Sequence, residues 1–332
     1  MPEIYVNSRG DKKFVAPPRV EPPRIETWEA DSPPIPDFDD QLREFLRRQA
    51  YREHVDEFPR EASVETPSDR VGLLVASGDK HFGCEGFDWA QFMHDSKLIQ
   101  DTNNVYELEL GDIVDNLFFS RSEQIFNLAE QIQMLNSWAK MMVDKGKMLA
   151  SVGGNHQEWM FKLFGVEFYM LAFGYRDVVP YLRDGGDIHW RYGSVDYEIR
   201  ANHKTHYNSN LNPHHTNHRT YWMVAPRADI IVSAHTHSLT NEHWAVHREG
   251  GDQDVYFGKS GSYKKKDRYR DANGHIPAWQ TGALCYTVHP FKKEIWQVVG
   301  VDKGVRLQEM LNWELDQGKN LGVKTIVEEL SR

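Results

Sequence analysis

The chain has 332 residues, of which 40% are hydrophobic, and its formal net charge is -10 at pH 7. This length predicts one catalytic domain with smaller additions, and the negative charge argues weakly against a protein that coats nucleic acid without specificity. The two cysteines, Cys84 and Cys285, cannot make a disulfide framework, and no apolar run approaches the roughly 18 residues of a membrane span, so we expect a soluble cytoplasmic protein without a membrane partner.

Prolines concentrate in the first part of the chain, where ten of the fifteen lie within the first 67 residues. Such a segment favours extended chain over packed helix, so residues 1–70 are predicted to form a proline-rich arm. Apolar residues from Phe38 to Ala50 recur at helical spacing and predict one amphipathic helix over residues 38–57. Two roles stay open for the arm: it wraps on its own catalytic domain, or it joins copies of the chain in a homo-oligomer or with a partner.

From residue 71 the sequence changes to short apolar runs of strand length that end in small or polar residues. The runs that precede polar clusters cover residues 71–77, 104–110, 147–152, 195–201 and 228–234. Further strands are predicted at 255–260, 283–290 and 294–301, and the clearest helix at 121–144. Loops held by a sheet are the usual place for functional residues, so we predict a catalytic domain over 71–305 and a C-terminal tail or helix over 306–332.

Five polar clusters follow the first set of runs in order: Asp79-Lys80-His81, Gly111-Asp112 to Asp115, Gly154-Asn155-His156, His203, and His235-Thr236-His237. In extended chain, side chains at i and i+2 point the same way, so Asp79 and His81 are predicted to converge on one cation while Lys80 faces elsewhere. His235 and His237 repeat that geometry. Each cluster alone is typical of an ordinary turn or surface, but the ordered set indicates a site for two divalent cations.

The clusters contain both expected ligands and residues with other roles. Asp112 is expected to bridge the two cations, because a carboxylate has two oxygens and is costly to bury unpaired. Asn155 would bind the second cation, while His156 would stay unligated and act as an acid or as a donor to the phosphoryl oxygens. Asp115 is either a helix cap or the residue that orients a catalytic histidine.

The order D-x-H, G-D-x-x-D, G-N-H, H and x-H-x-H resembles the calcineurin-like metallophosphoesterase superfamily from residue 71 to the region of residue 300. The resemblance implies that Asp79, His81, Asp112 and His237 hold one metal, and that Asp112, Asn155, His203 and His235 hold the other. It also implies a hydroxide that bridges the metals and attacks phosphorus in line, with His156 assisting the leaving oxygen and Asp115 fixing the tautomer of His156. The implied fold is an α+β, four-layer α/β/β/α sandwich with the metal site at the sheet edge.

Two positions depart from the family pattern. Ala234 stands before His235 where many members have glycine, which is a small change that leaves the ligands intact. Asn116 follows Asp115 where phosphoprotein phosphatases of the superfamily have an arginine that clamps a phosphate monoester dianion. The missing arginine lowers the case for a serine/threonine protein phosphatase.

The segment 203–219 is rich in histidine and asparagine and follows a predicted strand. His203 would complete the shell of the second cation, and His206 is its competitor for that role. Asn208 suggests a polar loop that borders the metals and contacts the substrate, although other histidines of the segment can equally be exposed and inert. Similar loops occur in bacterial and phage members of the superfamily that are distantly similar to repair exonuclease subunits.

A basic segment at residues 264–270 offers a second set of substrate contacts. Its cations are Lys264, Lys265, Lys266, Arg268 and Arg270, with Tyr263 and Tyr269 interleaved. Such cations would attract a phosphate backbone and the tyrosines could stack on unpaired bases, whereas the plain alternative is a solvated basic loop.

The expected function is a dinuclear-metal phosphoester hydrolase, with phosphodiesters such as DNA favoured over monoesters. The alternatives are a phosphomonoesterase that acts on protein or small molecules, and a non-catalytic scaffold that retains the fold. The nitrogen and oxygen ligand set admits Mn, Fe, Zn, Ni or Co, and manganese is the expected metal for activity.

Overall fold

The computed structural model describes two compact units, Met1–Asp56 and Glu57–Arg332, each taken by itself. The described residues are 4–6, 12–14, 39, 42–43, 46, 59–115, 125–164, 179–205, 212–248, 251–265 and 281–317. In the first unit, β1 (Ile4–Val6) pairs with β2 (Lys12–Phe14) in an antiparallel hairpin. The described residues of the predicted amphipathic helix are helical, and two of them, Leu42 and Leu46, are exposed.

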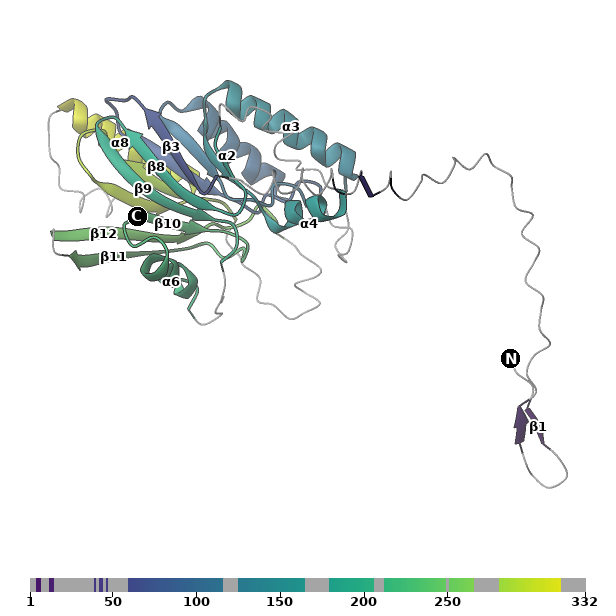
Figure 1. Cartoon of the computed structure of the whole chain (residues 1–332). Coiled ribbons are helices and arrows are strands. Elements are labelled where there is room, and N and C mark those ends of the chain that lie inside the picture. Colours follow the sequence, from purple (N-terminus) through teal and green to yellow (C-terminus); the bar gives the residue numbers. More distant parts are fainter. Residues whose placement is uncertain are drawn as a thin grey trace. The chain divides into compact units, whose positions relative to one another are not determined.

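The second unit contains two six-stranded sheets (Figure 1). The first sheet has the order β14 (Ile295–Val299), β13 (Leu284–Val288), β4 (Gly72–Ser77), β5 (Val105–Glu109), β6 (Met148–Val152) and β7 (Tyr181–Leu182). The second has the order β11 (Thr240–Arg248), β12 (Gly251–Lys259), β10 (Ile230–Ser233), β9 (Val195–Asn202), β8 (Gly186–Tyr192) and β3 (Glu61–Thr66). Strands β4 to β7 run parallel, and so do β9, β10 and β12, so several strands of each sheet end at one edge.

Side chains that alternate along each central strand hold the two sheets together. All six residues of β4 are buried; Leu73 and Val75 lie in the core beneath the helices, whereas Leu74 and Ala76 lie in the core between the sheets. A strand that is buried on both faces is therefore continuously apolar. Large aromatic residues fill the core between the sheets, including Trp190, which is fully buried.

Helices cover the outer face of each sheet. Contacts place α2 (Trp89–Asp101) and α8 (Val301–Gln317) against the first sheet, and α3 (Leu128–Asp144) contributes to the same core. On the second sheet, α6 (His215–Met223) packs on β10 and β12 over a separate apolar cluster. The layers are therefore helix, sheet, sheet and helix, which confirms the predicted α+β sandwich.

Several predicted boundaries differ from the observed ones. Strand β3 lies inside the range predicted as arm, where it pairs in parallel with β8, so the sandwich includes residues before 71. Helix α3 starts at residue 128 because Asn127 caps it and forms a capping box with Glu130, and Ile125 lies outside it, exposed. Helix α8 starts at residue 301 and packs on β13, so the last helix belongs to the sandwich; residues 318–332 lie outside the described part.

All eight apolar runs predicted as strands are strands, and their polar clusters follow the strand ends. Among the described residues, no helix combines the length and the apolar character that a membrane crossing requires.

We expect the substitution Trp190→Ala to lower the free energy of unfolding by about 3–5 kcal/mol, because it leaves a cavity between the sheets. It also removes the hydrogen bond that the indole donates to Thr66 Oγ1 at 2.9 Å. Guanidinium unfolding measures the change. The matched control is Trp222→Ala on α6, whose side chain is 61% exposed and whose loss should cost little. Equal losses for the two variants would contradict this account of the core.

Candidate metal centre

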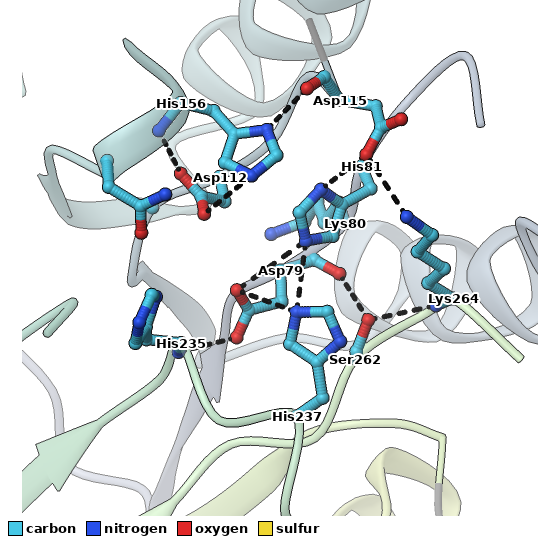
Figure 2. Close-up of polar contacts among 12 residues, drawn as sticks. Asp79, Lys80, His81, Asp112, Asp115, His156, His235, His237, Ser262 and Lys264 are labelled. Carbon is cyan, nitrogen blue, oxygen red and sulfur yellow. Dashed lines mark hydrogen bonds and ion pairs between the residues drawn. The ribbon is translucent and has the colours of Figure 1, made fainter. Parts of the chain in front are cut away.

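The five polar clusters meet at one edge of the sandwich, where strands from both sheets end (Figure 2). Asp79 follows β4, Asp112 follows β5, and Asn155 is the first residue of α4 (Asn155–Phe164), which follows β6. His203 follows β9 and His235 follows β10. Residues that are up to 158 positions apart thus become neighbours, because the carboxyl ends of neighbouring parallel strands share an edge; the separation is that of Asp79 and His237.

The backbone of these loops is strained at the predicted ligands. Asp79, His81, Asp112, His235 and His237 have φ values between 50° and 69°, and only one further non-glycine residue of the described part, Asn104, has a positive φ. Each such conformation costs on the order of 1–3 kcal/mol and persists where the surroundings impose it, typically at functional sites. The expected side-chain convergence is therefore present, but left-handed residues produce it and not the extended chain that the spacing suggested.

A first group of possible ligands contains Asp79, His81 and His237. The Nε2 atoms of His81 and His237 lie 3.1 Å apart. Asp79 Oδ1 lies 3.7 Å from Nε2 of His81 and 3.4 Å from Nε2 of His237. Asp79 Oδ1 is buried and accepts no hydrogen bond. The other oxygen of Asp79 accepts from the backbone N–H of His235 at 2.7 Å, which links this group to the second one.

The second group contains Asp112, His203 and His235, with Asn155 beside it. His203 Nε2 lies 3.1 Å from Asp112 Oδ2 and 3.0 Å from Asn155 Oδ1. The Nδ1 of His203 faces the carbonyl oxygen of Leu110 at 2.7 Å, so the proton sits on Nδ1 and Nε2 presents its lone pair to the site. His203 thus lies with Asp112, Asn155 and His235, whereas its competitor His206 lies outside the described residues.

The imidazole nitrogens and carboxylate oxygens of the two groups face one another with their lone pairs. A proton or a metal cation between these atoms offsets the repulsion of the lone pairs. In the metal-free protein a proton takes this place: burial lowers the pKa of His203, but Asp112 more than offsets it and raises that pKa to about 9. For His81, burial likewise lowers the pKa, and Asp115 and Asp79 raise it to about 9. Divalent cations bound to imidazole and carboxylate would replace these protons, so the donor set fits the predicted metals.

Asp115 contacts His156 as predicted, through its backbone carbonyl, and its carboxylate contacts a second histidine. Its backbone carbonyl accepts from Nδ1 of His156, while its carboxylate lies 2.9 Å from Nδ1 of His81 and 3.4 Å from Nζ of Lys264 (Figure 2). The carboxylate therefore forms an ion pair with His81, a predicted ligand, and the main chain sets the tautomer of His156.

His156 sits at the edge of both groups. Its backbone N–H donates to Asp112 Oδ1 at 2.9 Å, and its Nε2 lies 3.7 Å from Asp112 Oδ2. Burial lowers the pKa of His156, so the ring is predominantly neutral near pH 7, with Nδ1–H given to Asp115 and the lone pair of Nε2 facing the site. In this state His156 is an acceptor; the predicted donor role requires the imidazolium form.

The two described residues of the basic segment differ in burial: Lys264 is buried, whereas Lys265 is exposed. Lys264 is buried and ion-paired to Asp115, and Lys265 pairs with Asp88 at 2.5 Å. Tyr263 is buried and donates to Asp95 at 2.8 Å, so it is not placed to stack on a base. The remaining predicted substrate residues, Asn208, Lys266 and Arg268, lie outside the described residues, and their roles stay predictions.

A buried ion pair beneath the first ligand loop was not predicted. Lys80 Nζ lies 2.9 Å from Glu107 Oε1 and 3.6 Å from Glu109 Oε1, and all three side chains are almost fully buried. Glu109 in turn accepts from the backbone N–H of Gly111 at 3.0 Å. The sequence did hold a signal for this ion pair. Lys80 stands between two predicted ligands, and Glu107 and Glu109 stand within an apolar strand, and buried charges are normally paired.

Two glycines make the close approach of the loops possible. A Cβ on Gly154 would lie 2.1 Å from Asp112 Oδ1, and one on Gly111, whose φ is +96°, would lie 2.7 Å from Nδ1 of His203. Neither position has room for a side chain while the carboxylate and imidazole keep their places.

The comparisons with known proteins leave the family open. No family model matches the chain, and no curated protein matches it. Among solved structures, Vacuolar Protein Sorting 29 from Cryptosporidium parvum is 14% identical with a TM-score of 0.37, over 70% of this chain and 98% of that one. The phosphoesterase YfcE from E. coli is 16% identical with a TM-score of 0.34, over 68% and 98%. Vps29 complexed with zinc from Entamoeba histolytica is 13% identical with a TM-score of 0.33, over 68% and 98%.

We expect Asp115→Asn to weaken metal binding about 10- to 100-fold, because the substitution removes the charge that orients His81 as a ligand. Titration calorimetry of the metal-free protein with Mn²⁺ or Zn²⁺ measures the affinity. Asp88→Asn is the matched control, since Asp88 pairs with Lys265 away from the ligands and asparagine also caps α2. Unchanged affinity in Asp115→Asn, or an equal loss in the control, would show that Asp115 does not support the centre.

Proposed function

We propose that this protein is a metal-dependent phosphoester hydrolase whose centre holds two divalent cations and that it belongs to the calcineurin-like metallophosphoesterase superfamily. One observation carries the proposal: seven predicted ligands from five strand ends lie at one edge of the sandwich, four of them buried, with nitrogen and oxygen atoms facing one another. The ordered sequence pattern independently points to the same chemistry.

Asp112 supports the two-cation form of the proposal. It takes part in the group with His203 and His235 and also in a group with His81 and His156. Asp112 lies between the ligands of the two sides, and a carboxylate can bind two cations through its two oxygens. The backbone N–H of His156 donates to one of these oxygens and fixes the orientation of the carboxylate.

The donor atoms limit the metals. The possible ligand groups among the described residues contain histidine and aspartate without cysteine. Such a set suits Mn, Fe, Zn, Ni or Co, and we propose manganese as the metal that supports activity. When bound, the cations supply positive charge that polarises a phosphoryl oxygen and lowers the pKa of water.

The residues of the chain itself supply orientation and proton transfer. His156 Nε2 is the ring atom that faces Asp112, so His156 is the group placed to hold or move a proton near the reacting phosphorus. Asp115 is ion-paired with the ring of His81, and the carbonyl of Leu110 holds the ring of His203 in one tautomer. Because these partners are buried, the centre is preorganised before substrate binds.

We propose phosphodiesters as the preferred substrates, with phosphomonoesters as the alternative. The support is Asn116, which stands where an arginine would clamp a monoester dianion. The basic segment no longer adds support through Lys264 or Tyr263, because both side chains are buried. The proposal of DNA as a substrate is therefore supported by the family resemblance and by the predicted roles of Asn208, Lys266 and Arg268, which lie outside the described residues.

Purified protein should bind two Mn²⁺ ions per chain and cleave at least one of four substrates: a chromogenic monoester, a chromogenic diester, single-stranded DNA and double-stranded DNA. Metal content is measured by plasma mass spectrometry after dialysis. Asp112→Ala should lose metal, whereas His156→Ala should keep metal and lose about 10²- to 10⁴-fold in kcat.

The matched controls are Asp254→Ala and His243→Ala, which break a surface pair with an Nε2–Oδ1 distance of 2.8 Å. If Asp112→Ala and His156→Ala matched the parent on every substrate, the catalytic assignment would be wrong. Full metal binding without cleavage of any substrate would favour the scaffold alternative.

A further inference from the structure

A cavity of about 270 Å³ opens beside the second ligand group. Its wall includes two predicted ligands, Asn155 and His203, so a molecule whose phosphoester sits at the centre would extend into it. The rest of the wall comes from the first turn of α4 and from residues next to β7 and β9. The proposed reaction at the metal centre assigns no role to this space.

A buried hydrogen-bond donor lines the cavity. Gln157 is only 2% exposed, and its Oε1 accepts from the backbone N–H of Asp112 at 3.3 Å, which fixes the orientation of the amide. The Nε2 of Gln157 is buried and has no hydrogen-bond partner. A buried donor without an acceptor costs about 1–3 kcal/mol, so the site favours a ligand that brings an acceptor oxygen.

Two cationic side chains line the same cavity. Lys204 follows the ligand His203 directly, and the guanidinium of Arg183 lies over the ring of Phe161, with Cζ at 4.2 Å from the ring centre. Stacking on Phe161 restricts the plane of the guanidinium, and a planar guanidinium matches the geometry of phosphate oxygens.

Two carboxylates, Glu158 and Asp184, also line the cavity, and their negative charge must be weighed against the positive charge of the two cations. Glu158 is ion-paired with Lys162 at 2.5 Å, so its charge is engaged on the outer side of α4. Asp184 is exposed at the rim. A metal cation could be drawn to these oxygens, but the amide donor of Gln157 would face that cation with its N–H groups. The buried donor therefore favours an anion in the interior of the cavity.

We propose that this cavity binds a second phosphate group of the substrate, adjacent to the phosphoester at the metal centre, through Gln157, Arg183 and Lys204. The inference rests on the proposed hydrolase function and names its substrate class. The preferred substrates are nucleotides or strands that carry a phosphate next to the reacting one, and a simple ester with one phosphate lacks this contact.

The binding test compares thymidine 3′,5′-bisphosphate with thymidine 5′-monophosphate by titration calorimetry in EDTA, so it does not depend on catalysis. The parent should bind the bisphosphate about tenfold more tightly than the monophosphate. Gln157→Glu keeps the acceptor for the N–H of Asp112 but replaces the donor with a carboxylate, and it should abolish the preference. Arg183→Met should reduce it, whereas Arg191→Met, which breaks an exposed pair with Asp196 at 2.8 Å, should not.

The kinetic test compares kcat/KM for the p-nitrophenyl ester of thymidine 5′-phosphate with and without a 3′-phosphate, in Mn²⁺. The ratio should exceed one in the parent and fall towards one in Gln157→Glu and Arg183→Met. No preference for the bisphosphate in the parent, or a preference that survives both substitutions, overturns the proposed subsite. If both esters are cleaved without preference, the subsite fails and the hydrolase stands. If the binding preference is present but neither ester is cleaved, the hydrolase fails and the phosphate site stands.

Discussion

Buried electron-donor atoms that point at one another are the constraint on which this structure depends. Nε2 of His203 lies within 3.1 Å of oxygens from both Asp112 and Asn155, and the Nε2 atoms of His81 and His237 lie 3.1 Å apart. Such an arrangement is favourable only where a proton or a cation lies between the facing atoms, and nearby carboxylates raise the pKa of His81 and of His203 to about 9. The sandwich therefore holds together a group of side chains that could bind a metal ion.

Contacts elsewhere in the molecule hold the loops of the site in place. Strands of both sheets end at the same edge, and the ligands that follow them adopt left-handed backbone conformations that would relax in an isolated loop. The loop that contains Asp79 and His81 is held in place because Lys80, between them, is paired with two glutamates of β5. It is also fixed from the side, because Ser262 Oγ donates to the carbonyl oxygen of Asp79 at 2.7 Å. The packed core thus maintains the strained backbone conformations at the edge of the sandwich.

The basic side chains near the candidate metal centre differ in where they lie. Lys264 is buried and paired with Asp115, whereas Arg183, which lies over Phe161, and Lys204 line a cavity beside the site. A charge that is already engaged by a buried carboxylate contributes to orientation, and a charge at a cavity wall can contribute to binding. Counting basic residues along the chain does not separate these roles.

The sequence by itself determined the strand runs through local periodicity, and residue chemistry marked the polar clusters that gather at the edge. The helix-sheet-sheet-helix layers were expected only from the resemblance of the ordered clusters to a known superfamily, and the structure confirms them. The tertiary structure decided which groups pair: the carboxylate of Asp115 contacts His81 and not His156, and it meets Lys264 from 149 positions away. A polar side chain pairs with whatever distant segment packs against it. Spacing along the chain carries no record of that choice, which is why the clusters that meet at the edge could be predicted and their supporting contacts could not.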